Sequence, residues 1–168
     1  TTFLKVDGDP EQYLTAITWN PDSKSVFVGV LNRDQNHLKM NQYNASSGDL
    51  TKTIFEEKSE IYVEPQHPLL FFPNSTTDFI WQSQRTGYNH LFHYNLEKGL
   101  VAQLTKGDWL VTDVLGFNEK KKEIYYTSTQ ETPLERHLYK INWSNFRVQK
   151  LDTGAGMHAG ILSKDGSW

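Results

Sequence analysis

Apolar and polar residues alternate in short runs along the chain, and runs of the same kind recur in the same order three times. Alternation with a period of two over about four to eight residues predicts half-buried β-strands. A shorter strand and a polar turn precede each of these runs, and the Pro, Asn, Asp and Ser residues of the turns favour tight chain reversal. The clearest runs are VFVGVL at 26–31, FIWQS at 79–83 and EIYYTS at 123–128.

The pair His-Leu opens the next strand of each stretch, at His37, His90 and His137. A turn rich in Gly, Asn or Ser then leads to a fourth strand. Four strands in a repeat of roughly 40 to 50 residues are typical of a β-propeller blade. The fourth strands are expected at 51–55, 101–107 and 147–154.

We therefore expect an all-β chain that forms a partial β-propeller, with about three four-stranded antiparallel blades plus the start of a fourth. Lys164, Asp165 and Gly166 are expected to form the first turn of that fourth blade. Because propellers close with about four to eight blades, a longer parent protein is expected. A meander or sandwich of evenly spaced hairpins is the alternative, but hairpins alone would not repeat His-Leu at matching places. The blade-like units are expected at 17–63, 70–111, 114–158 and, for the further blade, 161–168, within one propeller region that spans 1–168.

Composition excludes several classes of function. The 17 Lys and Arg residues are outnumbered by 20 Asp and Glu residues, so no surface for binding nucleic acid is expected. The chain has no cysteine, which excludes disulfides and thiolate metal sites. No apolar run approaches the roughly 20 residues that cross a bilayer, so no membrane-spanning segment is expected.

The segments between these landmarks resemble a known family. Their order matches the propeller of the dipeptidyl peptidase IV family, which belongs to the prolyl oligopeptidase clan of serine peptidases, and the resemblance runs from about Tyr13 to Gly166. It implies a parent serine exopeptidase that releases N-terminal dipeptides with Pro or Ala second. The propeller would then gate substrate access to an α/β-hydrolase domain that this chain lacks. The matching segments are LNRDQNHLKM at 31–40, FIWQSQRTGYNHLFHYN at 79–95, LTKGDWLVTDV at 104–114 and ETPLERHLYKI at 131–141.

The resemblance also carries expectations about partners and site residues. It implies a peptide substrate bound through the hydrolase domain, no cofactor, and a homodimeric parent that is periplasmic or extracellular. In the family, a Glu-Glu motif of an earlier blade binds the substrate's amino group, whereas Glu56 and Glu57 are expected here in a solvated turn. The long junction that follows them corresponds to a segment lining the substrate pocket. Glu64, Gln66 and His67 are therefore candidates for peptide contact.

No catalytic residue is expected in this chain. A nucleophile elbow needs Gly-x-Ser-x-Gly, and the nearest string, GILSKDG at 160–166, has the wrong spacing. His90 and His93 would point to opposite faces of a strand, so no metal site is expected there. We expect the recurring residues His37, His90 and His137 to make a repeated structural hydrogen bond.

Two other functions stay open at this point. A stand-alone propeller could serve as a scaffold that binds another protein, without any enzyme domain. The chain could also belong to a related prolyl oligopeptidase or acylaminoacyl peptidase of the same clan.

Overall fold

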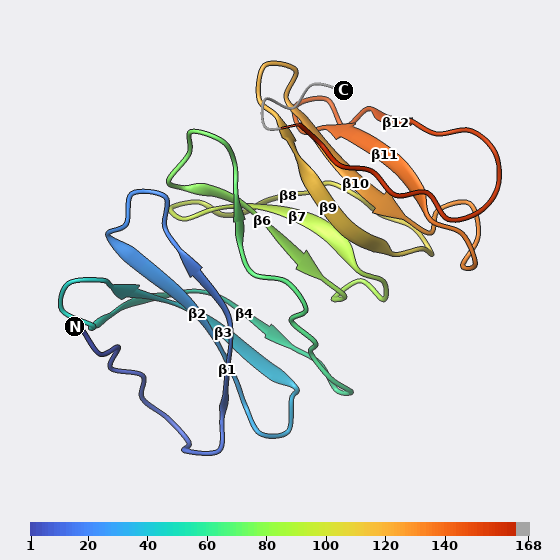
Figure 1. The fold of residues 1–168 in the computed structure, drawn as a ribbon. Helices are drawn as coiled ribbons and strands as arrows, with labels where there is room; N and C mark the ends of the chain where they lie inside the picture. Colours follow the sequence, from blue (N-terminus) through green and yellow to red (C-terminus); the bar gives the residue numbers. More distant parts are fainter. Residues whose placement is uncertain (164–168) are drawn as a thin grey trace. The chain divides into compact units, whose positions relative to one another are not determined.

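The computed structural model describes residues 1–163, which form twelve β-strands in three four-stranded sheets (Figure 1). Each strand pairs with its neighbour in the sequence, so every sheet is an antiparallel meander. None of these residues lies in a helix, which confirms the predicted all-β class with four strands in each repeat. In particular, the described residues contain no helix long and apolar enough to cross a membrane. The predicted turn at Lys164, Asp165 and Gly166 lies outside the described residues.

The chain divides into two compact units. Unit 1 consists of Thr1–Arg85 and Phe92–Ala102, and unit 2 consists of Thr86–Leu91 and Gln103–Trp168, of which the structure describes residues up to 163. The first sheet lies in unit 1 and the third sheet in unit 2, while the strands of the second sheet are divided between the two.

Strand β2, in the middle of the first sheet, buries both of its faces, because it is apolar at consecutive positions. Phe27 belongs to the largest hydrophobic cluster of unit 1, whereas its neighbour Val26 packs with Tyr43 on the opposite face. Leu4 and Val6 of the N-terminal segment pack against that second cluster. The first sheet has the order β1 (Tyr13–Trp19), β2 (Ser25–Leu31), β3 (His37–Asn44) and β4 (Leu50–Lys58).

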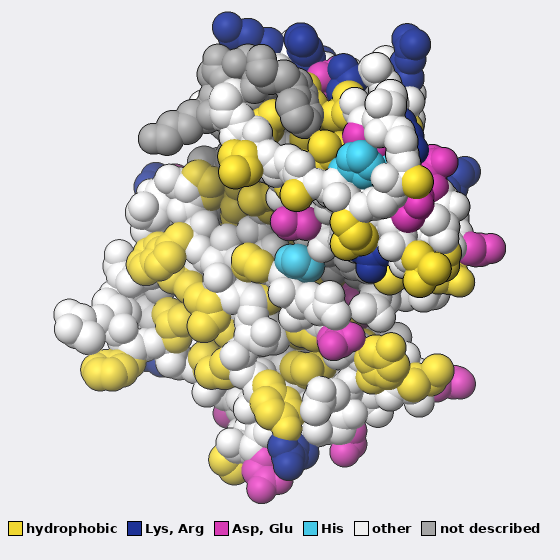
Figure 2. Space-filling model, turned by 45° about the vertical axis from the view of Figure 1, so that its right-hand side comes forward, with side chains coloured by type: hydrophobic (Ala, Val, Ile, Leu, Met, Phe, Trp, Pro, Cys, Tyr) yellow, Lys and Arg dark blue, Asp and Glu magenta, His cyan; other side chains and the backbone are white. Residues whose placement is uncertain are grey.

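Strand β1 differs from β2, because Ile17 and Trp19 are each 60% exposed. Figure 2 shows hydrophobic side chains reaching the surface in several groups on the face that it draws. Units of a repeat protein bury such surfaces only against neighbouring units, so an exposed apolar strand is typical of blade-like repeats.

The second and third sheets have the same meander order, but their last strands are shorter than predicted. Strand β8 ends before Thr105 because the Leu91 N–H donates to the Thr105 hydroxyl, and β12 ends before Asp152 because the Leu138 N–H donates to the Asp152 carboxylate. In both sheets a side chain thus replaces the next backbone partner. The strands are β5 (Leu70–Phe71), β6 (Asp78–Ser83), β7 (His90–Asn95) and β8 (Gly99–Gln103), then β9 (Val111–Asn118), β10 (Glu123–Ser128), β11 (His137–Asn142) and β12 (Val148–Lys150).

The prediction that Glu56 and Glu57 lie in a solvated turn is wrong. Both belong to β4, which continues to Lys58 because its pairing with β3 continues to the start of that strand. Only 8% of the Glu57 side chain is exposed. The Trp81 indole N–H donates to Glu57 Oε1 over 2.7 Å, and the Arg85 guanidinium forms an ion pair with the same oxygen. Glu57 therefore holds a buried hydrogen-bonded charge inside unit 1.

Replacing Glu57 with Ala is expected to lower the free energy of unfolding by about 3 kcal/mol, because the Trp81 N–H and the Arg85 guanidinium lose a buried acceptor. The matched control is Glu56→Ala at the next position, whose side chain is 42% exposed and whose loss should cost about 1 kcal/mol or less. Urea denaturation followed by tryptophan fluorescence measures both. Equal effects of the two substitutions would contradict the burial of Glu57.

Candidate functional site

The connection between β4 and β5 is held at both ends by buried apolar side chains. Val63 and Leu69 are 8% and 3% exposed and belong to the largest hydrophobic cluster of unit 1. The Val63 N–H donates to the carbonyl of Gln35 over 2.7 Å, and the Leu69 N–H donates to Thr18 Oγ1 over 3.1 Å. The backbone is thus fixed on each side of the stretch between the two anchors.

The three residues predicted to contact peptide lie on this stretch. Glu64 and Gln66 are exposed, and His67 is half-buried. Pro65 and Pro68 lie among these residues. The ring of each proline fixes its φ angle at about −65°, which restricts the backbone of the loop. The loop therefore presents a carboxylate, a carboxamide and an imidazole, all of which can hydrogen-bond to a peptide. That they contact a peptide stays a prediction.

The three recurring histidines stand at the first position of a strand in each sheet, namely β3, β7 and β11. Their rings have different partners, so the repeated position does not carry one repeated bond. The ring of His37 is partly exposed, and its Nε2 lies 2.7 Å from Glu56 Oε2. The other two rings, of His90 and His137, are each 1% exposed and lie in unit 2.

His90 has neutral hydrogen-bonding partners. Its Nδ1 lies 3.1 Å from Thr105 Oγ1, and its Nε2 lies 2.9 Å from the carbonyl of Gly107. The same Thr105 oxygen accepts the Leu91 N–H over 3.0 Å. All of these bonds are satisfied when Nε2 carries the proton and donates to the carbonyl while Nδ1 accepts from the hydroxyl.

His137 has the same place in the third sheet, but its partners are carboxylates. Its Nδ1 lies 2.7 Å from Asp152 Oδ1, and its Nε2 lies 2.9 Å from Glu135 Oε2. The other Asp152 oxygen accepts the Leu138 N–H. Asp152 therefore performs in the third sheet the two hydrogen-bonding tasks that a threonine hydroxyl performs in the second.

The exchange of a hydroxyl for a carboxylate reverses the direction in which the pKa of the histidine is shifted. Thr105 and Asp152 each stand 15 residues after the histidine that they contact. Burial lowers the pKa of His90, and a bond to a backbone carbonyl compensates only in part. Hydrogen bonds to Glu135 and Asp152 instead raise the pKa of His137.

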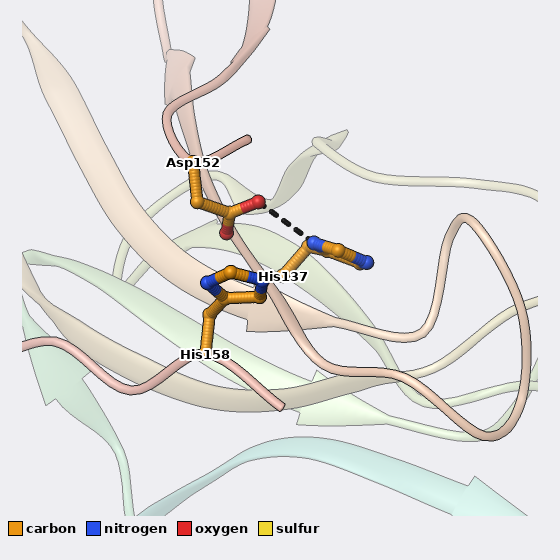
Figure 3. A group of neighbouring side chains, drawn as sticks. All are labelled: His137, Asp152 and His158. Atoms are coloured by element: carbon orange, nitrogen blue, oxygen red, sulfur yellow. Dashed lines mark hydrogen bonds and ion pairs between the residues drawn. The ribbon is translucent and has the colours of Figure 1, made fainter. Parts of the chain in front are cut away.

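A second imidazole joins His137 and Asp152 in unit 2 (Figure 3). His158 comes from the segment after β12, and its ring stacks on that of His137 with 5.0 Å between the centroids. Its backbone N–H donates to the carbonyl of Arg136 over 2.8 Å, and Arg136 and Met157 form an isolated parallel bridge. One nitrogen or oxygen from each of the three side chains lies within 4.8 Å of the others.

Sequence reasoning missed this group. Its three members do not follow any motif of metal-ligand spacing: Asp152 lies in the expected fourth strand at 147–154, and His158 lies after that strand, at the end of the expected unit 114–158. The signal that could have found it is positional: counting from the His-Leu pairs aligns Asp152 with Thr105, and the third repeat alone then has a carboxylate there.

Unit 2 also contains a pocket of about 470 Å³. Leu104, Trp109, Phe146 and Val148 supply its apolar lining, and Lys106 and Gln130 are among its polar residues. None of the residues predicted to contact peptide lines it.

Comparison with known proteins shows which family has this architecture. The model of a protein family described as "Dipeptidyl peptidase IV (DPP IV) N-terminal region" matches residues 2–168 of this chain. The chain belongs to this family. Its solved relatives include a Bacteroides ovatus protein assigned as a dipeptidyl aminopeptidase IV, with 39% identity and a TM-score of 0.86 over 97% of this chain and 26% of that one. Porphyromonas gingivalis dipeptidyl peptidase 4 has 26% identity and a TM-score of 0.81 over 92% of this chain and 22% of that one.

The probable dipeptidyl peptidase 4 of Emericella nidulans is 28% identical over 155 residues, which cover 85% of this chain and 20% of the fungal protein. The chain thus spans about a fifth to a quarter of these dipeptidyl peptidase IV relatives. The three meander sheets are therefore a partial propeller of the dipeptidyl peptidase IV N-terminal region, as the resemblance implied.

In this dipeptidyl peptidase IV propeller segment, an NMR titration of the histidine rings should give His90 a pKa below 6.5. Because the unfolded chain then binds the proton more tightly, the stability that neutral His90 contributes is present above about pH 6.5 and is lost as the pH falls through the lowered folded pKa.

The substitution Thr105→Asp should raise the pKa of His90 above 6.5, whereas the neutral control Thr105→Val should leave it low, because only the first places a carboxylate beside Nδ1. A pKa of 6.5 or higher in the unsubstituted chain would show that burial does not control this ring.

Proposed function

We propose that this chain forms part of the β-propeller of a dipeptidyl peptidase IV-like serine exopeptidase, and that this propeller gates the access of peptides to a hydrolase domain. The parent enzyme would release N-terminal dipeptides with Pro or Ala in the second position. The observation that carries the proposal is the family match over residues 2–168. Within the propeller, residues 17–63, 70–111 and 114–158 act as blades.

The chain's own residues support a binding role rather than a catalytic one. The sequence contains no Gly-x-Ser-x-Gly string, so the nucleophile has to come from another part of the parent. Residues 64–68 supply exposed polar groups on a loop whose ends are fixed by Val63 and Leu69. A pre-ordered loop loses little conformational entropy on contact with a ligand, which favours its use in a substrate-side wall.

The parent protein is expected to hydrolyse a chromogenic Gly-Pro anilide, and the 168-residue chain alone is not. A release assay of the chromophore measures both. Absence of activity in the parent would refute the dipeptidyl peptidase proposal, and activity in the isolated chain would refute the proposal that this segment is non-catalytic.

In the parent, Glu64→Ala and His67→Ala are each expected to raise KM for an oligopeptide about three- to tenfold with kcat unchanged, because each removes about one hydrogen bond of uniform substrate binding. Glu97→Ala is the matched control, since Glu97 is an exposed carboxylate in the turn between β7 and β8. Steady-state kinetics would exclude peptide contact by the loop if all three substitutions left KM unchanged.

A further inference from the structure

We infer that His137, Asp152 and His158 bind a divalent transition-metal ion of the zinc type. The three side chains converge in unit 2 from the start of β11 and from the segment that follows β12 (Figure 3). Two imidazoles and one carboxylate form a ligand set that Zn²⁺ commonly takes in proteins, with a further position left for water. None of its three residues belongs to the loop proposed to contact peptide.

The orientation of His137 is already that of a metal ligand. A histidine that binds a metal through one nitrogen usually donates its other ring N–H to a carboxylate or carbonyl. His137 Nε2 lies 2.9 Å from Glu135 Oε2, which leaves Nδ1 directed at Asp152 and at the centre of the group. Glu135 therefore acts as a positioning residue that fixes the imidazole.

The other two ligands are also held in place. One oxygen of Asp152 accepts the Leu138 N–H, so the second oxygen faces His137. The backbone of His158 is tied to Arg136, while its ring atom Nε2 is buried and makes no hydrogen bond with the described residues. A buried polar atom without a partner costs free energy, and a bound ion near this ring relieves the shortage of polar partners.

The charge around the group favours a cation. The carboxylates of Glu135 and Asp152 both contact His137, and the ammonium of Lys150 lies 3.9 Å from Asp152 Oδ1. With His137 neutral, as a metal ligand must be, these four side chains carry an excess of negative charge.

The second sheet provides an internal comparison. There the same histidine position, His90, faces a threonine hydroxyl, and the ring against it is that of Trp109, at 4.9 Å between centroids. Neither group is a ligand that zinc prefers. The third repeat has Asp152 and His158 around the equivalent histidine. A carboxylate thus stands in place of the Thr105 hydroxyl and an imidazole in place of the Trp109 indole, and both are ligands that zinc takes readily.

The geometry is close to what an ion requires. Ligand atoms at about 2.0–2.2 Å from a tetrahedral zinc stand about 3.3–3.6 Å apart. The Nδ1 to Oδ1 distance of 2.7 Å has to widen and the largest separation, within 4.8 Å, has to shorten. Shifts of about 1 Å by side-chain rotation achieve both.

The test titrates the metal-free 168-residue chain with Zn²⁺ by calorimetry and with Co²⁺ by visible absorption, which reports tetrahedral coordination. One ion per chain is expected. His158→Gln should lower the association constant at least tenfold, and circular dichroism should show an intact fold, because the lost Nε2 has no hydrogen bond with the described residues. Asp152→Asn, which keeps an oxygen for the Leu138 N–H, should weaken binding as well.

The matched control is His93→Gln. His93 Nε2 lies 2.8 Å from Asp78 Oδ1, so it is a histidine beside a single carboxylate in unit 1, and its loss should leave the affinity unchanged. Failure of the unsubstituted chain to bind Zn²⁺ would overturn the inference. Equal binding by the chain and by folded His158→Gln would overturn it too, because the ion would then sit elsewhere.

Discussion

Most of the middle strands of these sheets are buried on both faces, and the rest of the structure depends on that constraint. A strand with two buried faces needs apolar side chains at consecutive positions, as in β2 and β10. Polar groups at the ends of such strands then have little water to bind, so they have to find partners within the protein. His90 and His137 stand at such ends, and both have such partners.

Strand periodicity and the His-Leu repeat were sufficient to predict the class of fold, because both depend on local alternation and on spacing along the chain. The ends of the strands were harder to predict. Strand β4 continues through Glu57, which pairs with Leu38 of β3 and whose carboxylate is bonded by Trp81 and Arg85, far along the chain. Strand β12 stops early because a carboxylate takes over a backbone bond. Both effects depend on three-dimensional partners that no sequence window contains.

The candidate residues show the same division. Glu64, Gln66 and His67 could be proposed from the length of one junction and from a family resemblance, and the structure adds the anchoring of their loop by Val63 and Leu69. The group around His137 could not be proposed from spacing. A repeated fold keeps the backbone bond to the residue after the histidine, and it allows either a hydroxyl or a carboxylate to accept that bond. Repetition of structure therefore leaves room for chemistry that does not repeat.

The loop anchored by Val63 and Leu69 separates two demands that usually conflict. The two apolar anchors pack in the hydrophobic core, so the fold does not depend on the polar side chains between them. Such a segment can exchange its outward-facing residues over evolutionary time while the scaffold stays intact. Substitutions among related proteins can therefore accumulate in this loop, where they change the chemistry of the surface and leave the free energy of unfolding almost unchanged.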